Sequence, residues 1–257
     1  MSRATMAVAL VACLTLAGCS SDPDVVATNL PSAGAVTTTA DPAPTEEASP
    51  LDGLSAVEVW EKTKADAADA ESFHVAARLV DEGQKVAINL KVAKSGKAFG
   101  ALVFNGNKIT IRRLGRTLYY KGDRGFWTAN ADAATATALA DKWIVVNQSA
   151  AAEMAEFFEL TDMDFILDDA LSLTAAEQKA LKLAPGIDIG TQKTVGLTEA
   201  AGSEKGEFQT LYVADADPAL PLNFAMATDN GQYMKFRGWG KDFNVVAPKG
   251  AIDLANG

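Results

Sequence analysis

Apolar positions near the N-terminus form one short block rather than a periodic pattern. The block runs from Ala4 to Leu16 behind a single basic residue, Arg3. A charged start, a short apolar core and small residues before a cleavage site are the layout of a secretory signal. The block ends in Leu16-Ala17-Gly18-Cys19, and a plain cleavage site does not need a cysteine there. An ordinary signal peptide, or an apolar helix with a chance cysteine, is the alternative interpretation.

Those last four residues resemble a bacterial lipobox. The resemblance implies that the Cys19 thiol receives a diacylglycerol, that a peptidase cuts before Cys19 and that the mature protein begins there. Residues 1–18 are then a lipoprotein signal peptide. We expect the mature chain on the extracytoplasmic face of the cell membrane, held there by its acyl chains, since two or more chains anchor a protein stably.

After the cysteine the chain becomes polar and irregular. Residues 20–52 are rich in Ser, Thr, Ala, Pro, Asp and Glu, and contain no Lys, Arg or aromatic residue. Such a segment buries too little apolar surface to offset the entropy lost on ordering. We expect residues 19–52 to form the lipidated cysteine and a disordered tether, and residues 53–257 to form the folded domain.

The folded domain begins with a helical period and then changes to a strand period. Apolar residues recur at helical spacing from Ser55, and Ser55 with Glu58 forms a capping box, which predicts a helix over 55–70. Strict alternation with turn signals then predicts an antiparallel meander. The expected strands span residues 73–80, 86–92, 98–104, 108–114 and 117–121.

The middle of the chain is helical in character and the last part returns to strands. Phe126-Trp127 is expected to be a short extended piece, and capping residues such as Ser149, Asp162 and Thr174 introduce helical segments. The expected helices span 131–142, 150–160, 163–171 and 175–183. The expected strands span 187–197, 207–213, 220–228 and 232–239, with Asn230-Gly231 as a tight hairpin.

This order of elements predicts an α+β fold. One long antiparallel sheet of around nine strands tends to curl, and helices can pack on one of its faces. We therefore expect a strongly curved sheet, or half-barrel, packed on its concave face by helices, with an apolar cleft between the two layers.

Charge narrows the set of partners. The formal net charge is −10, which argues against nucleic acid, because phosphate backbones are bound by clustered Lys and Arg. It also argues against a basic face that lies flat on anionic lipid. Membrane contact is then expected through the acyl anchor on Cys19.

Few side chains are candidates for catalysis or metal binding. Cys13 leaves with the signal and Cys19 is lipidated, so the mature domain has no free thiol. His74 is the only histidine and sits in a strand, so a metal site or a triad lacks parts. We expect no catalytic residue, metal or cofactor, and a protein that is not an enzyme.

Two acidic groups offer weaker candidates. Asp162, Asp164, Asp168 and Asp169 cluster, but a calcium loop needs a glycine and a terminal Glu that are missing here. Capping and a solvated helix face explain them better. Glu153 and Glu156 stand three apart, which favours one exposed helix face over glycosidase chemistry.

The layout as a whole resembles a known group. Lipobox, tether, helix, five-strand meander, helical insert and closing meander are similar to the actinobacterial LppX/LprG lipoproteins and, more distantly, to the LolA/LolB carriers. Leu211 to Leu222 and Tyr233 to Gly240 carry the resemblance in residues. It implies a half-barrel with a hydrophobic cavity for acyl chains, in a protein that carries lipid or lipoglycan across the cell envelope.

The alternation supplies candidates for the lining of such a cavity. They are Val75, Leu79, Ile88, Leu90, Ile111, Leu118, Phe157, Phe158, Ile166, Phe224 and Met226. In one interpretation the strand and helix residues of this set pack against each other as a dry core. In the other they stand apart and leave a slot for acyl chains. The alternative function is an envelope binding or sensor module that partners another protein and has no lipid cargo.

Overall fold

The computed structural model describes residues 48–81, 83–147, 155–199, 210–225 and 232–254. One compact unit spans Ser49–Gly257. Cys19, most of the predicted tether and the Asn230-Gly231 hairpin lie outside the described residues.

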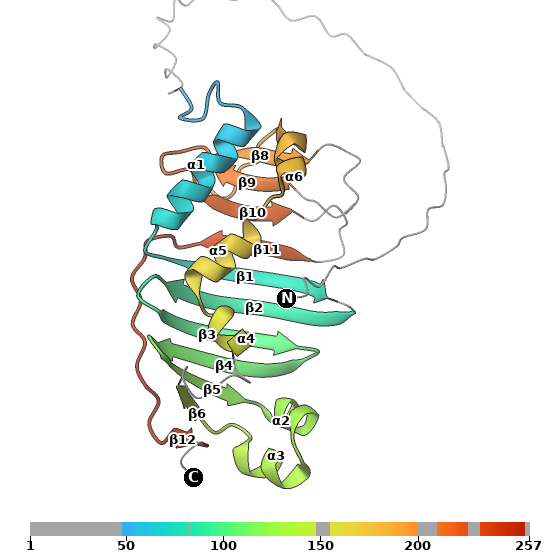
Figure 1. Cartoon of the computed structure of the whole chain (residues 1–257), viewed down its shortest axis with the longest axis vertical. Helices are drawn as coiled ribbons and strands as arrows, with labels where there is room; N and C mark the ends of the chain where they lie inside the picture. Colours follow the sequence, from blue (N-terminus) through green and yellow to red (C-terminus); the bar gives the residue numbers. More distant parts are fainter. Residues whose placement is uncertain (1–47, 82, 148–154, 200–209, 226–231, 255–257) are drawn as a thin grey trace, which may run out of the picture. The chain divides into compact units, whose positions relative to one another are not determined.

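A single sheet organises this unit (Figure 1). Twelve strands are described in it, in the order β12-β6-β5-β4-β3-β2-β1-β11-β10-β9-β8-β7. All neighbours are antiparallel except β12 and β6, which are parallel. The strands are β1 Ser72–Asp81, β2 Gln84–Ala93, β3 Lys97–Phe104, β4 Asn107–Leu114, β5 Thr117–Gly122, β6 Ile144–Asn147, β7 Leu181–Ala184, β8 Thr194–Glu199, β9 Thr210–Ala214, β10 Pro221–Ala225, β11 Tyr233–Arg237 and β12 Ile252–Asp253.

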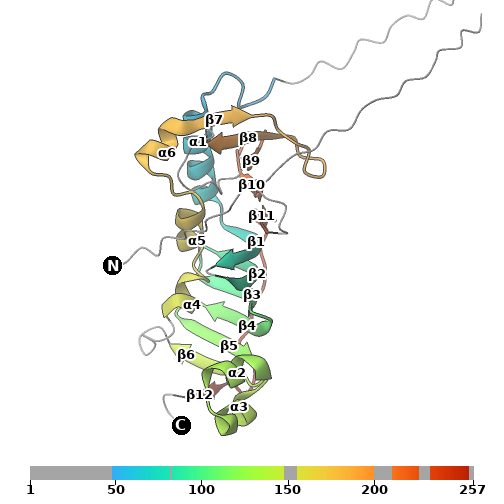
Figure 2. The same cartoon turned by 90° about the vertical axis from the view of Figure 1, so that its right-hand side faces the viewer.

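Helices cover one face of this sheet. Figure 2 shows α1, α5 and α4 on the same side of the strands, which we term the covered face. The opposite side is termed the outer face. The helices are α1 Ala56–Asp69, α2 Arg124–Asn130, α3 Ala133–Leu139, α4 Ala155–Glu159, α5 Met163–Ala170 and α6 Ala175–Ala180.

The first helix forms where the sequence predicts it. The Ser55 side chain accepts from the Glu58 backbone N–H, and the Glu58 carboxylate accepts from the Ser55 N–H, so the capping box is complete. Val59, Trp60, Thr63 and Ala67 are buried. Their spacing puts them on one side of the helix, and this side packs into the core.

The core lies between the covered face and the helices. On β1 to β5 the alternate residues Val75, Leu90, Leu102, Ile111 and Leu118 are at most 2% exposed. Residues of α4 and α5, including Phe158 and Leu167, belong to the same apolar cluster. The structure therefore confirms the predicted α+β class and the predicted five-strand meander.

Several predicted elements are wrong. Phe126-Trp127 lies in α2, not in an extended piece, because the Asp123 carboxylate caps the helix by accepting from the Phe126 N–H. Residues 181–183 belong to β7 rather than to the preceding helix. Of the predicted strand 187–197 only residues 194–197 lie in a strand of the sheet, β8. The short strands β6 and β12 have no predicted counterpart.

A C-terminal strap (residues 238–251) runs from β11 to β12 along the ends of the strands (Figure 1). The Gly240 N–H donates to the Ser72 carbonyl, and the rings of Phe243 and Phe99 are 5.6 Å apart. Arg112 Nη1 donates to the Val246 carbonyl at 3.0 Å. The strap covers one end of the outer face and leaves the other end open to the solvent.

Candidate apolar binding site

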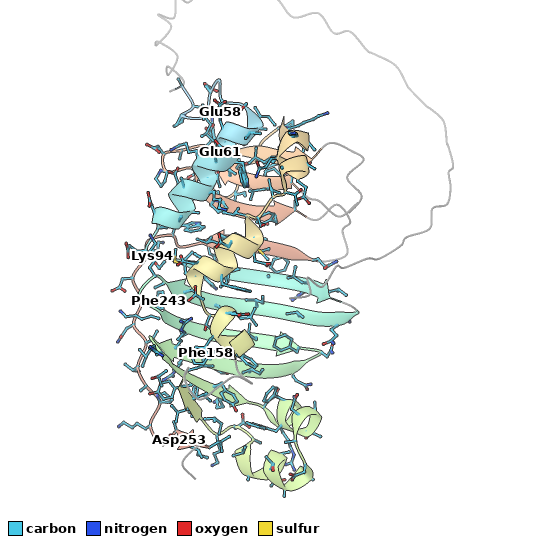
Figure 3. All side chains as sticks on the ribbon, in the orientation of Figure 1. Glu58, Glu61, Lys94, Phe158, Phe243 and Asp253 are labelled. Atoms are coloured by element: carbon cyan, nitrogen blue, oxygen red, sulfur yellow. The ribbon has the colours of Figure 1, made fainter. Side chains whose placement is uncertain are left out.

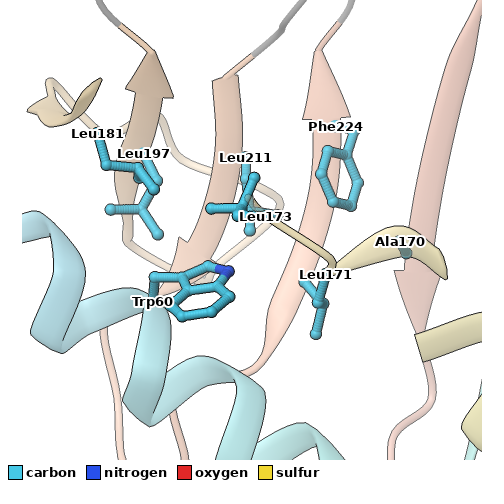
Figure 4. Close-up of a pocket in the computed structure, with 8 residues that line it drawn as sticks. All are labelled: Trp60, Ala170, Leu171, Leu173, Leu181, Leu197, Leu211 and Phe224. Atoms are coloured by element: carbon cyan, nitrogen blue, oxygen red, sulfur yellow. The ribbon is translucent and has the colours of Figure 1, made fainter. Parts of the chain in front are cut away.

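The covered face and the helices enclose a small apolar cavity near the β7–β10 end of the sheet. It is lined by Trp60 from α1, by the segment after α5 and by four strands (Figure 4). The lining residues are Trp60, Ala170, Leu171, Leu173, Leu181, Leu197, Leu211 and Phe224. The cavity volume is about 20 Å³, which is room for one water molecule.

Trp60 supplies the one polar atom of this lining side-chain set. The residue is 8% exposed, and its Nε1–H is buried with no hydrogen-bond partner among the described residues. Figure 4 shows the indole among the leucines, with its nitrogen turned toward the strands. A buried donor without a partner costs about 1–3 kcal/mol. An acceptor brought in by a ligand would recover this energy.

Arg113 fixes the helices to the sheet at β4, several strands away from the cavity. It is 7% exposed and lies on the covered face, in alternation with Ile109 and Ile111. Its Nη1 donates to the Phe158 carbonyl at 2.9 Å and lies 3.4 Å from an Asp162 carboxylate oxygen. The guanidinium thus donates to a carbonyl in the last turn of α4 and pairs with Asp162, the N-cap residue of α5.

The predicted lining residues are only partly gathered at this cavity. Phe224 lines it. Val75, Leu90, Ile111, Leu118 and Phe158 are buried in the main core, and Ile88, Phe157 and Ile166 pack against that core. Leu79 lies at a separate hollow near the β1–β2 turn, and Met226 is outside the described residues.

Sequence reasoning missed most of the residues that line the cavity. The periodicity placed Trp60 on the buried side of its helix, but not in a site. Leu181 and Leu197 come from segments where the prediction assigned a helix over 175–183 and one long strand over 187–197. A large aromatic with a polar edge, on a helix that must face apolar strands, was the available signal.

Asp162, one of the polar residues considered as a candidate, has a structural role. Asp162 Oδ1 accepts from the Asp164 and Phe165 N–H groups as the cap of α5. No group of three or more His, Cys, Asp or Glu residues converges in the described part of the chain. Cys19 and Glu153 lie outside that part, and the side chain of Glu156 is not described.

His74 lies on the outer face, away from the cavity. Its Nδ1 accepts from Arg237 Nε–H at 3.0 Å, so in the neutral ring Nε2 carries the proton and donates to Asn89 Oδ1 at 2.7 Å. Partial burial is the main cause that lowers the pKa of His74, and the charges of Arg237 and Lys91 add to it.

The fold is similar to that of solved mycobacterial structures. LprF from Mycobacterium bovis superposes with a TM-score of 0.51 at 14% identity, over 75% of this chain and 96% of that chain. The lipoprotein LppX from Mycobacterium tuberculosis gives a TM-score of 0.46 at 14% identity, over 74% and 98% of the two chains. The superposition on LprF confirms the fold that the sequence resemblance implied.

No family model matches this sequence, and no curated protein matches it. Among the described helices none is long and apolar enough to span a bilayer.

Proposed function

We propose that this chain is a membrane-anchored lipoprotein that binds acyl chains between its helices and its sheet, and carries lipid or lipoglycan across the cell envelope. The observation that supports this is the apolar cavity with the unpaired donor of Trp60. Residues 1–18 would be the signal peptide, 19–52 the lipidated Cys19 and tether, and 53–257 the lipid-binding domain. The proposal includes no catalytic step.

Trp60 would select the class of lipid. Burial of apolar chain drives entry at about 25 cal/mol per Å², but does not fix the position of the ligand. A buried indole N–H donates to a carbonyl oxygen, and an ester-linked acyl chain carries one. We therefore propose that the Trp60 Nε1–H donates a hydrogen bond to the carbonyl oxygen of an acyl ester.

Entry requires the helices to move. A cavity of about 20 Å³ does not hold an acyl chain. The helices α4, α5 and α6 are 5, 8 and 6 residues long, and helices this short depend on packing for their stability. Displacing Leu171 and Leu173 from the strands exposes apolar surface that the acyl chain then covers again.

The test uses residues 20–257, which include every described residue. The ligands are a fluorescent acyl ester and its ether analogue, which lacks the carbonyl. We expect the ester to bind, and Trp60→Phe to weaken ester binding roughly five- to tenfold, the worth of about one neutral hydrogen bond. Ether binding should change little.

Trp127→Phe is the matched control. The Trp127 Nε1–H is also buried without a described partner, but Trp127 does not line the cavity. Equal losses of ester affinity in the two variants would mean that Trp60 does not bind the ester. If the wild-type chain takes up neither probe and no lipid is found by native mass spectrometry, the carrier function is wrong.

One observation favours a second candidate, the envelope binding or sensor module. The described core is nearly filled by its own side chains. A protein that works by partnering needs no space inside. In that case the domain would form a stoichiometric complex with one envelope protein, seen by size-exclusion chromatography with light scattering, while both probes remain unbound.

A further inference from the structure

The outer face of the sheet is basic although the chain is acidic. Strand register places Arg78, Lys85, Lys91, Lys108, Lys121 and Lys235 on this face, and we term these six the basic face. No Asp or Glu occupies an outer-face position of β1 to β5 or β11. None of the six forms an ion pair with a described carboxylate.

Exposed acidic residues stand on the helices of the other side. Glu58 and Glu61 stand on α1 (Figure 3), and Asp164 and Asp168 stand on α5. All four are exposed. At physiological ionic strength the Debye length is about 8 Å, and both the sheet and the helix layer lie between these carboxylates and the basic face. An anion in contact with the basic face is therefore largely screened from these carboxylates.

Aromatic and aliphatic side chains stand among the cations. Arg78 and Lys235 lie 5.9 and 5.1 Å from the ring centre of Tyr233, and Lys91 lies 5.4 Å from that of Phe99. Val80, on the same face, is 43% exposed. A face that mixes cations, rings and aliphatic groups suits the boundary between lipid headgroups and acyl chains.

A hollow marks one place on this face. It has a volume of about 350 Å³ and is lined by the outer-face residues Arg78, Val80, Lys85 and Val103. Leu79 and Val86, from the other face of the same strand ends, also line it beside the β1–β2 turn. Lys108 lies directly across from Val103 in the register of β3 and β4. Two cations that line the hollow, a third on the adjacent strand β4 and an aliphatic lining suit a phosphate headgroup with its glycerol.

We propose that the basic face docks on a bilayer that contains anionic phospholipid, with one headgroup seated in the hollow. The net charge of −10 concealed this surface, because the structure separates the two signs of charge. The anchor expected at Cys19 would hold the face at high local concentration beside its bilayer. Docking does not depend on the acyl site, since the two lie on opposite sides of the sheet.

The experiment measures sedimentation of residues 20–257 with vesicles. One set is phosphatidylcholine alone, and the other is equal parts phosphatidylcholine and phosphatidylglycerol. We expect binding to the anionic set only, and its loss in about 1 M salt, where the Debye length is near 3 Å. Each basic residue beside an anionic surface contributes roughly fivefold. The variant Arg78→Gln/Lys85→Gln/Lys108→Gln should therefore bind on the order of 100-fold more weakly.

The control variant is Lys64→Gln/Lys142→Gln/Lys179→Gln. It changes the net charge by the same amount but alters none of the six residues of the basic face. Its affinity for anionic vesicles should stay within a few-fold of the wild type. Circular dichroism and the melting temperature establish that both variants fold.

Absence of binding to anionic vesicles overturns the proposal, and so do equal losses in the two variants. Binding to soluble dextran sulfate without vesicle binding also overturns it, and assigns the face to a soluble polyanion. Failure of acyl ester binding leaves this result untouched, so the two proposals fail separately.

Discussion

At the scale of single residues, His74 shows how neighbours fix a protonation state. Arg237 Nε–H donates to one ring nitrogen, which only the neutral ring can accept. Partial burial, Arg237 and Lys91 lower the pKa of His74, while the bond to Asn89 opposes them. The ring is therefore held neutral at pH 7 as part of the outer face, not as a catalytic base.

This arrangement predicts a pH dependence of stability. The pKa of His74 is lower in the folded state than its value of about 6.5 in the unfolded chain, so below that pH the unfolded state binds more protons. The stability contribution is complete above about pH 6.5 and decreases as the pH falls toward the folded pKa. His74→Gln should flatten this part of the profile in urea unfolding, and an unchanged profile would contradict the assignment.

At the scale of secondary-structure elements, Arg113 joins helices α4 and α5 to strand β4. Arg113→Met would remove the charged donor from the Phe158 carbonyl and would break the pair with Asp162. We expect a loss of about 2–3 kcal/mol in unfolding free energy, and faster hydrogen exchange in α4 and α5 than in α1. Arg112→Met, on the opposite face, is the control and should leave exchange in α4 and α5 unchanged.

The sequence predicts elements best where the information is local. Ser55 with Glu58 and Thr174 with Glu177 formed the capping boxes that begin α1 and α6. Alternation found β1 to β5, whose residues are buried on one face. It failed at β7, where Leu183 is 50% exposed, because pairing with β8 rather than its own pattern makes this segment a strand.

The candidate site was less predictable than the fold. Alternation shows which residues point inward, but not where two inward surfaces fail to meet. Trp60, Leu173 and Leu211 come from segments far apart in the chain and meet only through the strand order β9-β8-β7 and the path of α1. No local pattern contains that information.

At the scale of the whole molecule, the sheet separates two surfaces of different chemical character. Its covered face and helices make an apolar site, and its outer face carries the cations. Net charge described neither surface, since it averages the acidic helices with the basic strands. The distribution of charge is fixed by register, because a shift of one residue would exchange the two faces.

A ligand that enters the apolar site must stabilise the whole domain. A ligand that binds only the folded state at about 100 times its dissociation constant adds about 2.7 kcal/mol. For a domain of roughly 200 residues this raises the melting temperature by about 5–10 °C. The acyl ester should therefore raise the melting temperature of the wild-type chain, and should raise that of Trp60→Phe less at the same concentration. The Arg78→Gln/Lys85→Gln/Lys108→Gln variant should show the full shift, because its cavity is intact. A shift that is absent from the wild type, or equal in wild type and Trp60→Phe, would mean that the ester does not reach the indole, and the cavity would then be only a packing defect of the core.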